Sequence, residues 1–166
     1  MDNQKKSPAL LRAAVAGLGG GVIWLVTMSL LFGPAQIILA NPDFQSEKFL
    51  YVVTQLEPLP RAAGTWWILP AGVLFIAMIH GIAYHFVRDA FSGLPAWSKG
   101  VRFGLVAWML MVPWFLFYLP WNVMHEPVLL VMLEMVLWMA VMLSVGLAIS
   151  VIYERKQSAD LLADQA

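Results

Sequence analysis

Three ionisable side chains lie inside long, otherwise uncharged stretches of the sequence, and these residues are the most able to carry chemistry. They are His80, His85 and Glu134. A charged group in the hydrocarbon of a bilayer is costly unless it is paired or hydrated, so such residues mark candidate functional positions. A carboxyl or imidazole group in that setting suits proton or cation handling, or it makes a structural hydrogen bond.

Glu134 has two polar residues predicted at a similar depth in the membrane. With about 1.5 Å of rise per residue, Glu134 lies about 10 Å from the middle of its helix, and Tyr118 and Ser29 on other helices reach the same level. These three side chains are predicted to form a hydrogen-bonded cluster if their helix faces converge. Desolvation would favour the neutral carboxylic acid, which suits a proton carrier and equally suits a structural hydrogen bond.

His80 is predicted about 5 Å from the centre of its helix, toward the other side of the membrane and level with Ser144 and the glycine pair 19–20. Tyr84 follows one turn later on the same helix face. Glycines opposite an imidazole could leave room for a flat cofactor. Alternatively they let the helices touch, so that Ser144 hydrogen-bonds the imidazole. His85 is expected to reach water at the end of the helix.

A haem or quinone near His80 is the cofactor hypothesis that these residues allow. The two axial histidines of a haem must face each other from different helices, whereas His80 and His85 share one helix and His125 lies in a predicted loop. A quinone would use His80, Tyr84 and Trp108. Neither pattern is specific, so no cofactor is predicted.

The adjacent pair His125 and Glu126, in a predicted outer loop, is the remaining candidate. Helical zinc sites place two histidines four residues apart with a glutamate between them, and this spacing is missing. The pair could assemble a surface site with Glu134, or with Asp43 and Glu47, but no metal is predicted. The chain has no cysteine, which excludes thiolate metal sites. No phosphate-binding loop or catalytic dyad pattern occurs, so enzymatic activity is not expected.

The elements that must position these residues follow from composition. Of 166 residues, 61% are hydrophobic and 12% are charged, compared with about 45–50% and about 25% in soluble domains. This excludes soluble and disordered proteins and indicates an all-α integral membrane protein. A bilayer core needs roughly 20 apolar residues of helix. A single membrane domain (1–166) is predicted, a four-helix bundle with spans at 13–33, 66–87, 103–121 and 128–153 and with tails at 1–12 and 154–166.

Lysine and arginine flank these spans asymmetrically. Eight of the ten lie before the first span, between the second and third, or after the fourth, and only Lys48 and Arg61 lie in the two opposite loops. Positive loops are retained in the cytoplasm, so both termini are predicted to be cytoplasmic, and the bacterial cytoplasmic (inner) membrane is favoured. The formal net charge is zero, so no nucleic-acid binding is expected.

The first outer loop is predicted to contain a shorter helix. Asn41 followed by Pro42 is a helix-start signal, and apolar residues at 49, 52, 53 and 56 repeat with helical spacing. A short amphipathic helix at 42–56 is therefore predicted to lie on the outer membrane surface. There it would cap the bundle, dock a partner or gate a substrate.

Small residues at four-residue spacing are the predicted helix contacts. They are Gly17 and Gly21 in the first span, and Ala140, Ser144 and Ala148 in the fourth. In lipid, helices associate through close backbone approach, which small residues permit. The same stripes suit packing within one chain or the seam of a homo-oligomer.

Three classes of function are compatible with this sequence. The favoured one is a non-catalytic membrane protein: a subunit, assembly factor or stress-related component of a complex, with copies of itself or other membrane subunits as partners. The alternative is an oligomeric proton- or cation-coupled transporter or channel that uses Glu134 and His80. The third is a redox subunit that binds haem or quinone.

Overall fold

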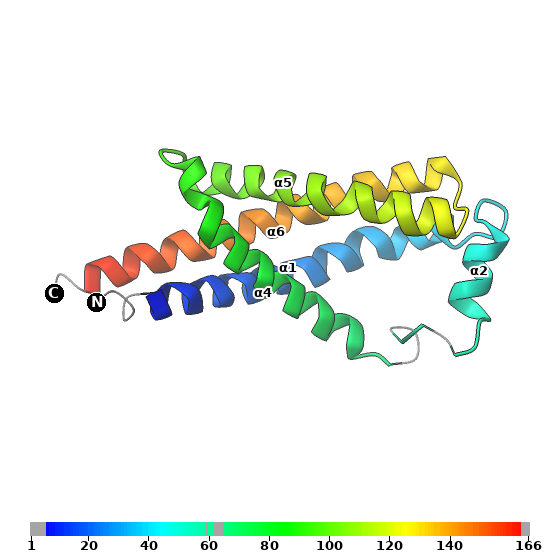
Figure 1. The fold of residues 1–166 in the computed structure, drawn as a ribbon, viewed down its shortest axis with the longest axis horizontal. Coiled ribbons are helices and arrows are strands. Elements are labelled where there is room, and N and C mark those ends of the chain that lie inside the picture. The colour runs from blue at the N-terminus through cyan, green and yellow to red at the C-terminus, as the bar shows by residue number, and fades with distance from the viewer. Residues whose placement is uncertain (1–5, 59, 62–64, 164–166) are drawn as a thin grey trace.

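A computed structural model of the chain describes residues 6–58, 60–61 and 65–163 (Figure 1). The described part is helical and contains no β-strand. Four stretches of helix in it are long and apolar enough to cross a membrane: Ala9–Leu39, Ile68–Phe91, Ala96–Val123 and Val128–Gln157. The prediction of an all-α protein with four helices of spanning length is therefore confirmed.

The helices follow one another along the chain with short connections. In order they are α1 (Lys6–Leu39), α2 (Glu47–Thr54), α4 (Ile68–Val87), the 3₁₀ turn η1 (Arg88–Phe91), α5 (Ala96–Leu116), the π-helical segment η2 (Phe117–Val123) and α6 (Val128–Ala163). The start of α1, the end of α6 and the α4–α5 connection lie at one end of the molecule, which we call the terminal end (Figure 1). The opposite end, with the α1–α2 and α5–α6 connections, is the loop end.

Three of the long helices extend beyond their predicted spans. α1 continues through Pro34 to Leu39 instead of ending at residue 33, as membrane helices tolerate a proline when neighbouring groups satisfy the freed carbonyl. α5 begins at Ala96 rather than at 103, and α6 continues past 153 to Ala163. The two extensions meet where Lys99 on α5 pairs with Glu154 on α6 at 3.3 Å.

The helix between the first and second spans starts later than predicted. α2 begins at Glu47 rather than at Pro42, because Asn41 closes a turn in which its carbonyl accepts from the Gln45 N–H at 2.8 Å. Ser46 is the N-cap instead, and its hydroxyl accepts from the backbone N–H three residues later at 3.0 Å. The position of α2 at the membrane surface stays a prediction.

The long helices contact one another in the order α4, α1, α6, α5, so the bundle is open rather than closed. α4 crosses α1 and then diverges from the other helices toward the loop end (Figure 1). α4 meets α5 through Phe103, whose ring centroid lies 5.3 Å from that of Tyr84 and 6.5 Å from that of His80. All of these contacts lie in the part of α4 nearer the terminal end.

Glycines permit the crossing of α1 and α4. A Cβ at Gly81 would overlap the backbone of Ala13 and Gly17, and a Cβ at Gly17 would overlap the Ala77 carbonyl. Gly21 faces α4 in the same way. Both small residues predicted on the first span therefore make contacts within the chain, because only a missing side chain allows backbones to approach this closely.

The crossing of α5 and α6 depends on glycines that were not among the predicted contacts. A Cβ at Gly104 would overlap the Met142 carbonyl, and a Cβ at Gly100 would lie 2.6 Å from the Cα of Leu147. A Cβ at Gly146 on α6 would overlap the backbone of both of these glycines. The four-residue spacing of Gly100 and Gly104 was a usable signal, but residue 100 was assigned to a loop.

The three residues of the stripe predicted on α6 have different surroundings. Ser144 does face α1, with its hydroxyl 3.2 Å from Thr27 Oγ1, and Ala148 is half-buried. Ala140 is exposed. The closest approach lies at Gly146, two residues from Ser144, because α6 packs against α1 and α5 at once and uses a separate face for each.

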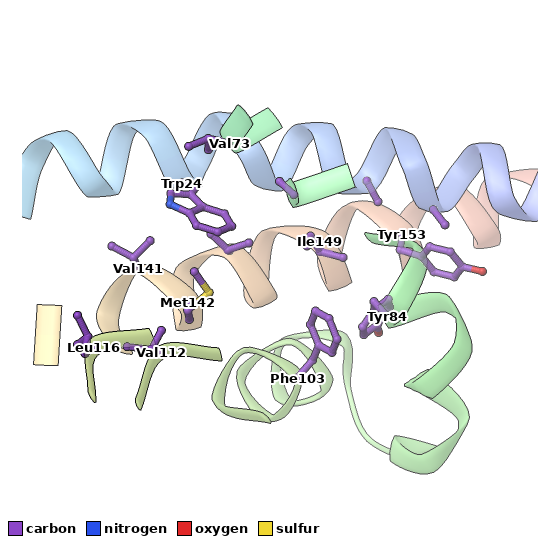
Figure 2. Close-up of a cluster of buried hydrophobic side chains, with 14 of the residues drawn as sticks. Trp24, Val73, Tyr84, Phe103, Val112, Leu116, Val141, Met142, Ile149 and Tyr153 are labelled. Atoms are coloured by element: carbon purple, nitrogen blue, oxygen red, sulfur yellow. The ribbon is translucent and has the colours of Figure 1, made fainter. Parts of the chain in front are cut away.

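The buried core follows the line of helix contacts and draws on all four long helices. Figure 2 shows Trp24 of α1 directed toward Val141 and Met142 of α6, with Leu116 of α5 beside them. Val73 is the contribution of α4 in this half of the molecule. The core therefore holds α1, α5 and α6 together along their lengths and holds α4 over a shorter distance.

Gly81→Ala is expected to lower the free energy of unfolding by about 1–3 kcal/mol, because the added methyl group has no space against α1. Gly72 lies on the same helix with nothing within 4 Å of an added Cβ, so it is the matched control. Gly72→Ala is expected to be neutral or to stabilise by up to about 1 kcal/mol, through helix propensity. Chemical denaturation in detergent measures both, and equal effects would contradict the packing described.

Candidate functional site

Polar side chains from all four long helices meet at the terminal end. We call this group the terminal cluster. Its members are Arg12, Tyr84, His85, Arg88, Lys99, Ser150, Tyr153, Glu154 and Gln157. Of these, only Tyr84 and His85 were singled out from the sequence as polar groups within a span.

The hydroxyl of Tyr84 is the centre of one half of the cluster. Tyr84 is fully buried, donates to the Glu154 carboxylate at 2.9 Å and lies 2.9 Å from the Ser150 hydroxyl. Ser150 donates to the Ala96 carbonyl at 2.6 Å, and Lys99 pairs with the other oxygen of Glu154 at 3.3 Å. These contacts tie the end of α4 to the start of α5 and to α6.

The ring of Tyr153 is the centre of the other half. Its hydroxyl lies 2.6 Å from Nδ1 of His85. His85 therefore lies near the end of its helix, as expected, and contacts another side chain there. The guanidinium groups of Arg12 and Arg88 each lie 5.1 Å from the Tyr153 ring centroid, within cation–π range. Arg88 also donates to Gln157. This half joins α1 to α4 and α6.

His80 does not meet Ser144. Its Nδ1 lies 2.8 Å from the Ile76 carbonyl of its own helix, and its ring lies edge-on to Trp24 at 5.7 Å. Ser144 instead bonds within α6 and to Thr27 of α1. The expected imidazole–serine contact is therefore wrong, because the two residues lie on faces that point to different neighbours.

The space that a flat cofactor would need beside the glycine pair 19–20 is filled. Cβ atoms at Gly19 and Gly20 would meet the side chains of Ile152 and Ile149 on α6. Trp108, the third residue of the quinone hypothesis, donates its indole N–H to the Met135 carbonyl at 3.0 Å. These residues therefore make helix contacts where the hypothesis needs a binding surface.

The predicted cluster of Ser29, Tyr118 and Glu134 does not form. Ser29 is exposed and donates to the Leu25 carbonyl of its own helix at 2.8 Å, while Tyr118 is exposed with its ring 4.9 Å from that of Trp114. Glu134 is partly buried and makes no hydrogen bond to any residue that the structure describes. Similar depth did not bring these residues together, because their helix faces do not converge.

Glu126 is a buried carboxyl group at the loop end. Its side chain is 2% exposed, and its Oε1 accepts from Gln45 Nε2 at 2.7 Å. Gln45 is itself buried and also donates to the Leu39 carbonyl. Oε2 of Glu126 is buried without a hydrogen-bond partner among the described residues. Burial raises the pKa of this carboxyl above its ordinary value, and the hydrogen bond from Gln45 opposes that rise in part.

His125 and Glu126 do not act as a joint ligand pair. His125 is exposed and has a positive φ of 58°, whereas the Glu126 side chain turns inward. The backbone N–H of Glu126 donates to the Pro120 carbonyl at 2.9 Å. Both residues line a surface depression of about 310 Å³ together with Trp121 and Asn122. Within the described ranges, no group of three His, Cys, Asp or Glu side chains could hold a metal ion.

No protein-family model, curated protein or solved structure matches the chain. The function is therefore inferred from the terminal cluster, from the part of α4 that diverges from the other helices, and from the contacts at the loop end.

Tyr84→Phe is expected to lower the free energy of unfolding by about 1–3 kcal/mol, because buried Ser150 and half-buried Glu154 both lose their contact with the hydroxyl. Tyr118→Phe is the matched control, because Tyr118 is exposed and its ring contact is kept. Its expected effect on stability is small. The same denaturation measurement in detergent checks both variants. If Tyr84→Phe were as stable as wild type, the terminal cluster would not hold the helices together.

Proposed function

We propose that this protein is a non-catalytic subunit of a membrane complex and that it binds another transmembrane chain along the loop-end half of α4. The observation that carries this proposal is the divergence of α4 from the rest of the bundle (Figure 1). A spanning helix of a self-contained bundle buries one face along its whole length. α4 buries a face from Val73 to Tyr84, and none of its first residues, 68–72, is buried.

The side chains of α4 agree with this proposal. Between its start and Ile76, Val73 is the buried residue, while Leu69, Phe75 and Ile76 are exposed, and Trp66 just before the helix is 85% exposed. Large apolar groups therefore point away from the chain in several directions. Such a surface suits lipid on one side and a second helix on the other.

Small residues in the same half would allow a second helix to approach closely. Gly72 has nothing within 4 Å of an added Cβ, and Ala71 beside it is exposed. The other glycines of the long spans, apart from Gly33, are filled by contacts within the chain. The terminal cluster fixes the opposite end of α4, so this surface is held in place before a partner arrives, which reduces the entropy lost on binding.

Native mass spectrometry after mild detergent extraction tests this proposal. Wild-type protein is expected to be released with a second transmembrane chain, either a copy of itself or another subunit. Gly72→Leu is expected to lose that chain, because the larger side chain blocks close approach. Gly33→Leu, on α1 with equally open surroundings, is the matched control and is expected to keep it. Solitary monomers from native membranes, or an intact complex with Gly72→Leu, would argue against a partner on α4.

Proton handling is the second candidate, and Glu134 is the observation that favours it. This carboxyl lies within a helix of spanning length, and no described residue hydrogen-bonds it. Trp138 follows one turn later on the same face of α6, and its ring lies against Trp24 of α1. The spacing of Glu134 and Trp138 supports a position for Glu134 on the face of α6 toward α1, inside the bundle, where ionisable residues of membrane proteins usually lie.

Glu134→Gln is expected to abolish proton flux in proteoliposomes under a pH gradient, because the amide cannot carry a proton. Glu47→Gln removes an exposed acid on α2 and is the matched control, with flux expected to remain at the wild-type level. A pH-sensitive dye inside the vesicles reports the flux. Unchanged flux with Glu134→Gln would exclude this second function.

A further inference from the structure

The buried carboxyl of Glu126 has no positively charged partner among the residues that the structure describes. One of its oxygens accepts from a neutral amide, and the other has no partner among the described residues. A buried carboxylate is costly without a compensating charge, so the local field favours a cation.

The depression beside Glu126 has the size and lining for a small organic cation. Its volume of about 310 Å³ exceeds what a bare metal ion needs, and a single carboxylate does not suit a divalent ion. Trp121 supplies an aromatic ring that is 41% exposed, and Asn122 and His125 supply polar groups. Carboxylate and aromatic groups together are the pattern by which proteins bind ammonium groups.

We propose that this depression binds a small organic ammonium ion at the loop end, with Glu126 as its counter-ion. The carboxylate of Glu126 is buried beneath the depression and attracts the ammonium group by its charge, while the ring of Trp121 covers the alkyl side of the ligand. Gln45 is a positioning residue, because its bond to Oε1 at 2.7 Å holds the carboxyl group with Oε2 unused. The bond from the Glu126 N–H to the Pro120 carbonyl fixes the backbone beneath it.

Two kinds of molecule carry an ammonium group of this type. A free amine in the outer solution and the ethanolamine headgroup of a phospholipid both present an ammonium group on a short alkyl chain. Tryptophans such as Trp121 are typical of the interface at which headgroups lie, so both sources can reach the depression. This site is separate from the surface of α4, and either proposal can fail without the other.

The first test measures the thermal unfolding of the full chain in detergent at pH 7.5, with increasing ethylammonium chloride or with sodium chloride at the same concentration. Ethylammonium is expected to raise Tm beyond the effect of sodium. Glu126→Gln is expected to weaken the apparent affinity for ethylammonium by about tenfold or more, since the counter-charge is lost. Glu47→Gln, which removes an exposed acid elsewhere in the outer loops, is expected to bind as wild type does.

Nanodiscs distinguish the two sources. If the headgroup is the ligand, wild-type protein is expected to be more stable in phosphatidylethanolamine than in phosphatidylglycerol, and Glu126→Gln is expected to lose this difference. Stabilisation by ethylammonium alone identifies a free amine, and both results support the site. If Glu126→Gln fails to fold, Trp121→Leu replaces it, because that ring is partly exposed and its loss is expected to weaken ethylammonium binding.

Acid is expected to compete with the ligand. Burial raises the pKa of Glu126, so its carboxyl takes up a proton at a higher pH than an ordinary glutamate, and ethylammonium binding falls as pH decreases through that value. Glu134 and His125 are the other titratable groups beside the site, and His125→Gln removes the imidazole from this profile. Equal stabilisation by sodium and ethylammonium, or wild-type affinity in both Glu126→Gln and Trp121→Leu, would overturn the proposal.

Discussion

The hydrogen bond from the Tyr84 hydroxyl to the Glu154 carboxylate, with Lys99 as counter-ion, is the interaction on which the rest of the arrangement depends. Lipid supplies no hydrophobic force between helices, so polar contacts and close backbone approach must select the packing. This group joins α4, α5 and α6, and the stacking of Arg12 on Tyr153 brings in α1. The helices are consequently gathered most completely at the terminal end.

The loop end is held by a different and smaller set of contacts. Gln45 bonds to Glu126, and Ser46 donates to the Met124 carbonyl at 2.6 Å, so the α1–α2 connection is tied to the α5–α6 connection. α4 takes no part in these bonds. The resulting asymmetry leaves the start of α4, residues 68–72, without a buried side chain and buries one carboxyl group between the connections, and these two features carry the functional proposals.

Sequence reasoning succeeded where a residue's own properties decide its surroundings. The apolar runs were long enough to require helices, and Gly17 and Gly21 lie at a crossing because their spacing places both on one face. Sequence reasoning failed where a contact depends on how two helices are rotated about their own axes. Ser29, Tyr118 and Glu134 share a depth, but depth along an axis says nothing about the direction in which a side chain points around it. Gln45 had no signal at all, since its role depends on Glu126, 81 residues later.

The sequence by itself determined the helical class, the four helices of spanning length and the polar residues within them. Hydrophobicity and length are local properties, and a bilayer admits few other structures for such segments. The tertiary structure decided which polar groups meet. Tyr84 hydrogen-bonds Glu154, and the crossings at Gly81 and Gly104 fix how the helices are rotated, while Glu126 is buried and the adjacent His125 is exposed. Those rotations depend on the fit between distant segments, which no local pattern records.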